Sequence, residues 1–434
     1  MLIQRAVLLD GTMTDIRVDE RIVEIGENLT PQRGEPVLDA AGGTVVPGLH
    51  DHHVHLRSAA AALTSARVGP AEVQSRDDLA RALAGAPIGS DGWIRAVGYH
   101  EAVAGPLDRA ALDELCPPVP VRIQHRSGLL WTLNSAGLAR VGLADHPDGR
   151  LLSADRSWSD TLQRNETGLA EISRRLCAHG VTGVTDATPD LEVSDVVKLV
   201  QAHRHGELLQ QVRCLAPGKR ILHDGELDLD ELTAWVAERH ADDAPVAVHC
   251  VTAAQLVVTV SALRTAGGHP RDRIEHAAVV PDDTVADLAE LGVTVVTQPN
   301  FVAERGDQYL ADIPAPRQHE LWRVASLLEA KVPVALSTDV PFGDADPWAA
   351  MRAAVRRTTA SGKVLGAGEC VSPGEALTMF FGSADRPTQP RSIEPGQPGD
   401  LCVLAPKPAE VLDELDSGMV AATIIAGDVV FERG

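Results

Sequence analysis

Two histidines separated by one residue stand at the end of a short apolar run near the start of the chain. Residues 47–56 read PGLHDHHVHL and contain His53 and His55. In an extended strand, residues i and i+2 project to the same side, so both imidazoles can enter one pocket. Neutral imidazole is a preferred zinc ligand. The pair therefore indicates a metal site, although an HxH segment alone is common.

Three further residues of suitable chemistry also end apolar runs. His249 follows VAV, His276 follows RIE, and Asp339 follows VALST. A single histidine after a strand is more often a packed core residue than a ligand. Four histidines and one aspartate at equivalent positions are harder to explain by packing, so we expect all five to converge, with Asp339 as the candidate general base.

Short apolar runs that alternate with helical patterns must position these residues. The chain has 434 residues, and the eight runs are 45–49, 119–124, 181–187, 211–215, 246–250, 273–277, 293–298 and 332–338. Helical periodicity separates most of them. This order predicts an α/β protein with a (β/α)8 TIM barrel, in which reactive groups gather at the carboxyl ends of the strands.

The two ends of the chain read as short strands with turns between them. Neither group can bury a sheet face alone, so we expect residues 1–48 and 395–434 to form one small β-sandwich. The barrel would then occupy residues 49–394, with an inserted segment near 59–116 that is too long for a simple connection.

Polar residues at other predicted strand ends are candidates for binding substrate. His125 and Arg126 follow the second run, and Gln298 and Asn300 follow the seventh. A guanidinium offers a planar fork of donors, so Arg126 could hold a carboxylate or carbonyl of the substrate. A structural salt bridge is an equally good explanation for Arg126.

Composition narrows the classes of partner. The chain carries 39 Lys and Arg against 61 Asp and Glu, a net charge of −22, which argues against nucleic acid or an anionic membrane as partner. The six cysteines form no CxxC pair, which is typical of reduced thiols. No signal-peptide pattern or membrane-spanning stretch stands out. We expect a cytoplasmic protein that acts on a small-molecule substrate, and a homo-oligomer is compatible with the sequence.

The ordered motifs PGLHDHHVH, VAVHC, RIEHA and LSTDVPFG resemble the metal-site motifs of the amidohydrolase superfamily. The segments GWIRAVGYH, HRSGLLWTLNS and GDLCVL are similar to its amidohydrolase-3 branch, which includes N-substituted formamide deformylases. The resemblance covers nearly the whole chain. It is specific for the superfamily and leaves the substrate open.

The resemblance implies that the four histidines bind one or two divalent ions, expected to be Zn²⁺, and that Asp339 is both a ligand and the general base. The implied reaction is hydrolysis of a carbon–nitrogen bond in a small non-peptide amide, formamide or cyclic amide by a metal-activated water. Deamination, or hydrolysis of an ester or lactone at the same site, is the alternative. A non-catalytic barrel used as a scaffold is a third interpretation, which the intact ligand set disfavours.

One motif departs from the family pattern. Many two-metal members bridge their ions with a carboxylated lysine, often four residues before an Asp-Gly pair. Here Lys219 precedes Asp224-Gly225 by five residues, and Arg220 stands at the expected spacing of four. Neighbouring strand residues face opposite sides, so only one of the two can point inward. Lys219 is our slightly favoured bridging ligand, and an exposed basic turn is the competing interpretation.

Overall fold

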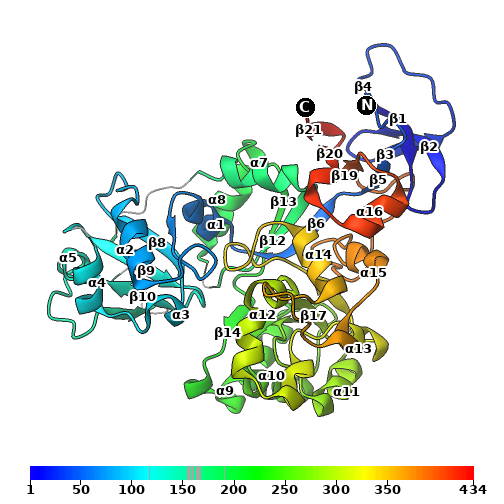
Figure 1. The fold of residues 1–434 in the computed structure, drawn as a ribbon. Helices are drawn as coiled ribbons and strands as arrows, with labels where there is room; N and C mark the ends of the chain where they lie inside the picture. Colours follow the sequence, from blue (N-terminus) through cyan, green and yellow to red (C-terminus); the bar gives the residue numbers. More distant parts are fainter. Residues whose placement is uncertain (117, 154–157, 159–160, 163–167, 190) are drawn as a thin grey trace. The chain divides into compact units, whose positions relative to one another are not determined.

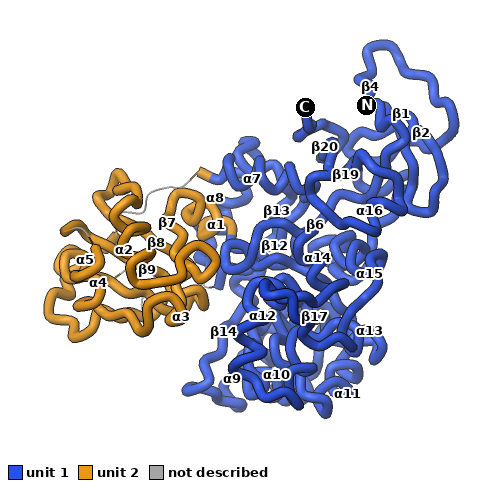
Figure 2. The backbone as a smooth tube through the Cα atoms, in the orientation of Figure 1, with its two compact units in different colours: residues 1–55, 169–434 blue, residues 56–168 orange. Residues whose placement is uncertain are grey.

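A computed structural model describes residues 1–116, 118–153, 158, 161–162, 168–189 and 191–434. The chain divides into two compact units (Figure 2). Unit 1 comprises residues 1–55 and 169–434, and unit 2 comprises residues 56–168.

The two ends of the chain meet in one sheet of unit 1 (Figure 1). Strand β19 (Leu401–Leu404) pairs antiparallel with β5 (Thr44–Pro47), and apolar side chains from both segments share one core. The pairings describe one eight-stranded sheet, and the predicted sandwich stays a prediction. Its other strands are β1 (Leu2–Val7), β2 (Met13–Val18), β3 (Ile22–Gly26), β4 (Val37–Asp39), β20 (Val420–Ile425) and β21 (Asp428–Glu432).

Parallel strands with intervening helices make up the rest of unit 1. One sheet has the order β13-β12-β6, and the other runs from β14 to β18 in sequence order. The strands are β6 (Leu49–Val54), β12 (Val181–Asp186), β13 (Gln211–Cys214), β14 (Lys219–Ile221), β15 (Ala247–Cys250), β16 (Arg273–His276), β17 (Thr294–Thr297) and β18 (Val334–Leu336). This alternation is typical of the TIM-barrel type of α/β fold.

Helices connect or follow these parallel strands. They are α7 (Ala170–Ala178), α8 (Val193–Arg204), α9 (Leu229–Ala241), α10 (Ala253–Ala266), α11 (Asp282–Leu291), α12 (Asn300–Asp312), α13 (Ala325–Glu329), α14 (Pro347–Arg356) and α15 (Pro373–Thr378). Helix α16 (Pro408–Glu414) lies between β19 and β20 in the sequence. None of the helices in the described ranges combines the length and apolar character needed to cross a bilayer.

The two parallel sheets come together at the ends of β6 and β18. The backbone N–H of Asp339 donates to the carbonyl of His53 at 2.9 Å, and the N–H of His55 donates to the carbonyl of Val340 at 2.9 Å. Among the described residues, no strand ladder joins β18 to β6 or β13 to β14, so a closed barrel remains a prediction.

The predicted second barrel strand was wrong. Residues 119–124 contribute to β9 (Val121–His125), which pairs with β8 (Ile94–Tyr99) and β10 (Leu130–Leu133) in unit 2. Val121 and Ile123 are buried in that unit's own core. An apolar run shows that a strand is buried but not in which sheet. Strand β14 takes its place and brings the parallel strands of unit 1 to eight. It has only three residues and begins with a lysine, so the search for apolar runs did not find it.

The first predicted run is divided between two sheets. Residues 45–47 belong to β5 of the terminal sheet, and Leu49 begins β6. Gly48 stands at the junction, where a Cβ atom would lie 2.2 Å from Cγ2 of Thr182. A side chain at this position would therefore clash with β12.

Unit 2 is longer than the insertion expected at 59–116, because β9 and β10 pair with β8. Its sheet has the order β11-β10-β9-β8-β7. The remaining elements are β7 (Ala66–Arg67), β11 (Arg150–Leu152), α1 (Leu56–Leu63), α2 (Arg76–Ala84), α3 (Glu101–Ala104), α4 (Arg109–Leu115) and α5 (Ser135–Arg140).

Candidate active site

Strand β6 and the residues that follow β18 bring two histidines and one aspartate together. The Nε2 atom of His55 lies 3.3 Å from Oδ1 of Asp339, and Nε2 of His53 lies 3.7 Å from the same oxygen. All three residues are buried, and their possible ligand atoms lie within 4.8 Å of one another. This spacing is suitable for a shared metal ion.

His249 and His276 pack beside this group. The ring centroids of His53 and His276 are 4.7 Å apart, and those of His249 and His276 are 4.4 Å apart. The five residues predicted from strand ends therefore occupy one region of unit 1.

The backbone is unusual where two of these residues leave their strands. His276 has φ of 73° and Asp339 has φ of 58°, both in the left-handed region. Such conformations cost about 1–3 kcal/mol for residues other than glycine, and they cluster at functional sites.

The structure distinguishes Lys219 from Arg220. Lys219 is buried and its Nζ lies 3.1 Å from Nε2 of His53. Arg220 instead lies over the ring of Trp235, 5.5 Å from its centroid, and forms an ion pair with Glu231. Burial lowers the pKa of Lys219 to about 8. The lysine is therefore the residue of this pair that faces the histidines.

A buried carboxylate orients His53. Nδ1 of His53 is hydrogen-bonded to Glu275, and Arg273 donates from Nε to Oε1 of Glu275 at 2.6 Å. Because a carboxylate only accepts hydrogen bonds, Nδ1 carries the proton and Nε2 presents its lone pair. A metal-binding histidine usually has such an outer partner.

The side-chain amide of Gln298 orients His276 in the same way. Nδ1 of His276 lies 2.8 Å from Oε1 of Gln298, while Nε2 of Gln298 donates to Oγ of Ser337 at 2.8 Å. The oxygen of Gln298 therefore accepts from His276, and Nε2 of His276 keeps its lone pair. Gln298 orients a candidate ligand in the structure, and its predicted contact with substrate remains a prediction.

Burial keeps three of the site histidines neutral. It lowers the pKa of His249 to about 3 and holds the pKa values of His53 and His276 well below the ordinary value. Oδ1 of Asp339 is buried and has no hydrogen-bond partner among the described residues. Imidazole and carboxylate lone pairs therefore point into one small region that has too few N–H or O–H donors to satisfy them. A divalent cation satisfies such a group of lone pairs. The residues therefore fit a metal ion.

Asp51 ties the two strands that carry this site. Oδ1 and Oδ2 of Asp51 accept from the backbone N–H and the hydroxyl of Thr338 at 3.1 and 2.5 Å. Burial raises the pKa of Asp51 to about 7. The side chain therefore fixes the register of β6 against the segment that leads to Asp339.

The other predicted substrate contacts lie in different surroundings. Asn300 begins α12, and its Nδ2 donates to Oε1 of Glu304 at 3.0 Å and to the carbonyl of Thr338 at 3.1 Å. His125 ends β9 in unit 2, and Arg126 follows it, so neither ends a parallel strand of unit 1. Their predicted contact with substrate stays a prediction.

His125 belongs to a second cluster of potential ligands, within unit 2. His100, Glu101 and His125 bring ligand atoms within 4.8 Å of one another. However, Nδ1 of each histidine accepts from a backbone N–H at 3.1 Å. Nε2 of His125 lies 3.1 Å from Oε2 of Glu101, so these contacts describe a hydrogen-bonded cluster better than a metal site.

Sequence reasoning missed Arg273 and Glu275. The signal was available, because Glu275 immediately precedes His276 and residues two apart on β16 face the same side. A charged pair at alternate positions of a buried parallel strand is costly unless it serves a partner. Here that partner is His53.

The sequence model of the amidohydrolase family matches residues 36–431. The N-substituted formamide deformylase of Arthrobacter pascens is 26% identical over 92% of this chain and 90% of that enzyme.

Solved structures share the fold. An uncharacterised metal-dependent hydrolase from Pyrococcus horikoshii superposes with a TM-score of 0.74 at 18% identity, over 96% of this chain and 99% of that one. The 5-methylcytosine deaminase of Klebsiella pneumoniae superposes with a TM-score of 0.59 at 16% identity, over 100% of this chain and 98% of that one. With a family match that spans most of its length, the chain belongs to the amidohydrolase family.

Proposed function

We propose that this protein is a metal-dependent hydrolase that cleaves a carbon–nitrogen bond in a small non-peptide amide, formamide or cyclic amide. The observation that carries the proposal is the meeting of His53, His55 and Asp339, whose ligand atoms lie within 4.8 Å in a buried site. Similarity to an N-substituted formamide deformylase over nearly the full length supports the choice of bond.

The protein's own groups would orient the reactants and move protons. A divalent ion, when bound, lowers the pKa of water and withdraws electron density from a carbonyl. Asp339 takes a proton from the attacking water and delivers it to the leaving amine, because its Oδ1 is buried and accepts no hydrogen bond from the described residues. Glu275 and Gln298 hold the rings of His53 and His276 in place.

We propose Zn²⁺ as the ion, because neutral imidazole and carboxylate together are typical zinc ligands. His249 and His276 would complete the ligand set. Lys219 lies where it could join a second ion: its Nζ is 3.1 Å from Nε2 of His53. Reaction of that amine with carbon dioxide, with loss of a proton, would convert it to a carboxylate ligand.

We further propose a cytoplasmic location. All six cysteines lie in the described residues, and all are free thiols, which suits a reducing compartment.

The test is a substrate screen with zinc-loaded full-length protein. N-formyl amines, N-acyl amines and cyclic amides form one set, and amino-heterocycles, esters and lactones form the other. The proposal expects turnover in the first set, lost in His55→Asn and retained in the control Asp287→Asn, which changes a partly exposed aspartate of α11. Turnover confined to the second set, or unchanged in His55→Asn, would contradict it.

A further inference from the structure

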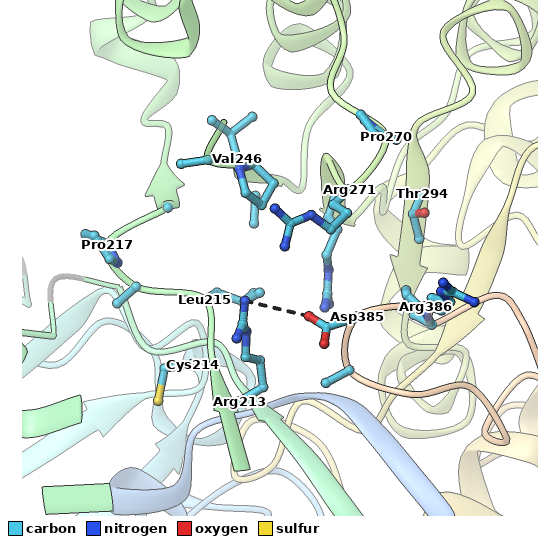
Figure 3. A pocket seen from close by; sticks show the side chains of 18 of the residues that line it. Arg213, Cys214, Leu215, Pro217, Val246, Pro270, Arg271, Thr294, Asp385 and Arg386 are labelled. Carbon is cyan, nitrogen blue, oxygen red and sulfur yellow. Dashed lines mark ion pairs between the residues drawn. The ribbon is translucent and has the colours of Figure 1, made fainter. Parts of the chain in front are cut away.

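Unit 1 contains a cavity of about 580 Å³ away from the histidine cluster (Figure 3). Its lining includes Ala247, Arg273 and Thr294, the first residues of β15, β16 and β17. His249 and His276 lie toward the other ends of β15 and β16. The cavity is therefore at the amino ends of these strands, whereas the candidate metal centre is at their carboxyl ends.

The charge of the lining is opposite to that of the chain. Five arginines and two aspartates line the cavity, which gives an excess of three positive charges (five minus two), whereas the whole chain has a net charge of −22. These residues are Arg213, Arg239, Arg271, Arg273, Arg386, Asp243 and Asp385. Such a concave, locally positive surface attracts an anion.

The labelled side chains show how this charge is arranged. In Figure 3 the guanidinium of Arg271 extends toward the middle of the cavity. Arg213 and Asp385 face each other across 3.7 Å, so one of the two acidic residues is already engaged. The guanidinium of Arg271 can still bind an oxyanion, since its Nη2 donates to the carbonyl of Asp243 over a long distance of 3.4 Å.

Arg273 supplies an independent indication. It is 5% exposed, and its Nε and Nη2 bind Glu275 at 2.6 and 3.1 Å. Its Nη1 is buried and has no hydrogen-bond partner in the part of the chain that the structure describes. A buried donor without an acceptor costs free energy. An acceptor from outside the protein would remove this cost.

The remaining wall is apolar. Val196 and Val200 of α8, Val212 of β13, Leu215 and Val246 line the cavity together with the arginines. A ligand that fits this surface has an oxyanion at one end and an apolar body at the other. Guanidinium groups bind phosphate and carboxylate oxygens well because their donors form a planar fork.

We propose that this cavity binds a small organic molecule with a phosphate or carboxylate group. The oxyanion contacts the guanidinium of Arg271, in the wall that Arg271 shares with Arg273, and the apolar body lies against the valines. Arg273 also holds Glu275, which orients His53, so the site is connected to the candidate metal centre through two side chains.

Calorimetric titration of the full-length protein tests this proposal, with phenyl phosphate and inorganic phosphate as the ligands. Phenyl phosphate should bind at least about tenfold more tightly than inorganic phosphate, because only the first buries apolar surface. Benzoate distinguishes a site that prefers carboxylates from one that prefers phosphates. No heat from any of the three at about 10 mM would overturn the proposal.

Charge variants of opposite sign locate the binding. Arg271→Gln should weaken phenyl phosphate binding by about fivefold or more, and Asp385→Asn should strengthen it because a nearby negative charge is removed. Arg264→Gln is the matched control, since this exposed arginine of α10 pairs with Asp287 and Glu290 outside the cavity lining. Its binding should equal that of the parent.

His55→Asn separates the two sites. Retained phenyl phosphate binding in this variant, with loss in Arg271→Gln, supports the cavity. Binding that disappears in His55→Asn but is unchanged in Arg271→Gln and Asp385→Asn would place the anion at the metal centre and refute the proposal.

Discussion

Replacing Glu275 by glutamine tests whether the buried ion pair positions a metal ligand. Glu275 is fully buried, accepts from Arg273 with both oxygens, and is hydrogen-bonded to Nδ1 of His53. Loss of an outer-shell carboxylate usually lowers metal affinity about 10–100-fold. We therefore expect zinc to bind Glu275→Gln about 10–100-fold more weakly than the parent protein.

The same substitution should also lower stability. It leaves the buried guanidinium of Arg273 without its carboxylate partner, and breaking such a pair costs about 3–5 kcal/mol. Chelated protein unfolded in urea measures this loss, and a zinc titration against a competing chelator measures the affinity. The two readings separate a structural role from a positioning role.

Glu369→Gln is the matched control. Glu369 is also buried, lies 3.2 Å from the guanidinium of Arg323, and accepts from the backbone N–H groups of Val324 and Ser326. It should lose stability but bind zinc like the parent. If Glu275→Gln bound zinc as tightly as Glu369→Gln does, Glu275 would not position His53 for a metal, and the reasoning would be refuted.

Three more predictions concern single residues. Asp339→Asn should lower turnover by about 100-fold or more while most of the metal remains, because general-base catalysis contributes roughly 10² to 10⁴; turnover within about threefold of the parent would remove Asp339 from its role. Where the parent protein holds two ions per chain, Lys219→Met should hold one by elemental analysis, whereas Arg220→Met should hold two; equal metal in both variants would reject a bridging lysine. The free energy of unfolding of the chelated protein should fall by about 1.4 kcal/mol per buried neutral histidine when the pH is lowered from 7.5 to 5.5. In urea unfolding, His249→Asn should lose less stability over the same range.

The direction of that pH effect follows from the pKa of His249. The folded-state pKa is about 3, whereas an unfolded histidine titrates near about 6.5. Above the unfolded pKa both states are neutral and the stability is fully present. As the pH falls below it, only the unfolded state binds the proton, so stability is lost on acidification. Equal losses in the parent and His249→Asn would contradict this explanation.

The sequence was informative where strand ends carry chemistry. His53, His55, His249, His276 and Asp339 were singled out because each ends an apolar run, and the structure brings these side chains into one region. Strand order alone was enough for this result, because the carboxyl ends of parallel strands lie at one side of the sheets.

The sequence could not show which distant strands pair with each other. The run at 119–124 has the same apolar character as the true parallel strands, yet it pairs with β8 and β10 in unit 2. The strand β14 has only three residues and begins with Lys219, so no apolar pattern marks it. The choice between Lys219 and Arg220 likewise required the parallel register of β14 against β15.

The partners of the candidate ligands were also hidden. Glu275 and Gln298 contact His53 and His276 through side-chain hydrogen bonds that span 222 and 22 residues of sequence. Local spacing cannot show which of many acidic and amide residues will meet a given imidazole. Buried charged residues at alternate positions, such as Arg273 and Glu275, are the signal to look for.

Elemental analysis of the full-length protein tests the central claim most directly. Parent protein, His55→Asn, and the control His319→Asn, in which an exposed histidine outside the site is changed, are loaded with zinc, passed through a desalting column and measured for zinc per chain. The account predicts at least one zinc ion per chain in the parent and the control, and a marked loss in His55→Asn. Equal zinc in all three proteins, or none in the parent, would contradict it.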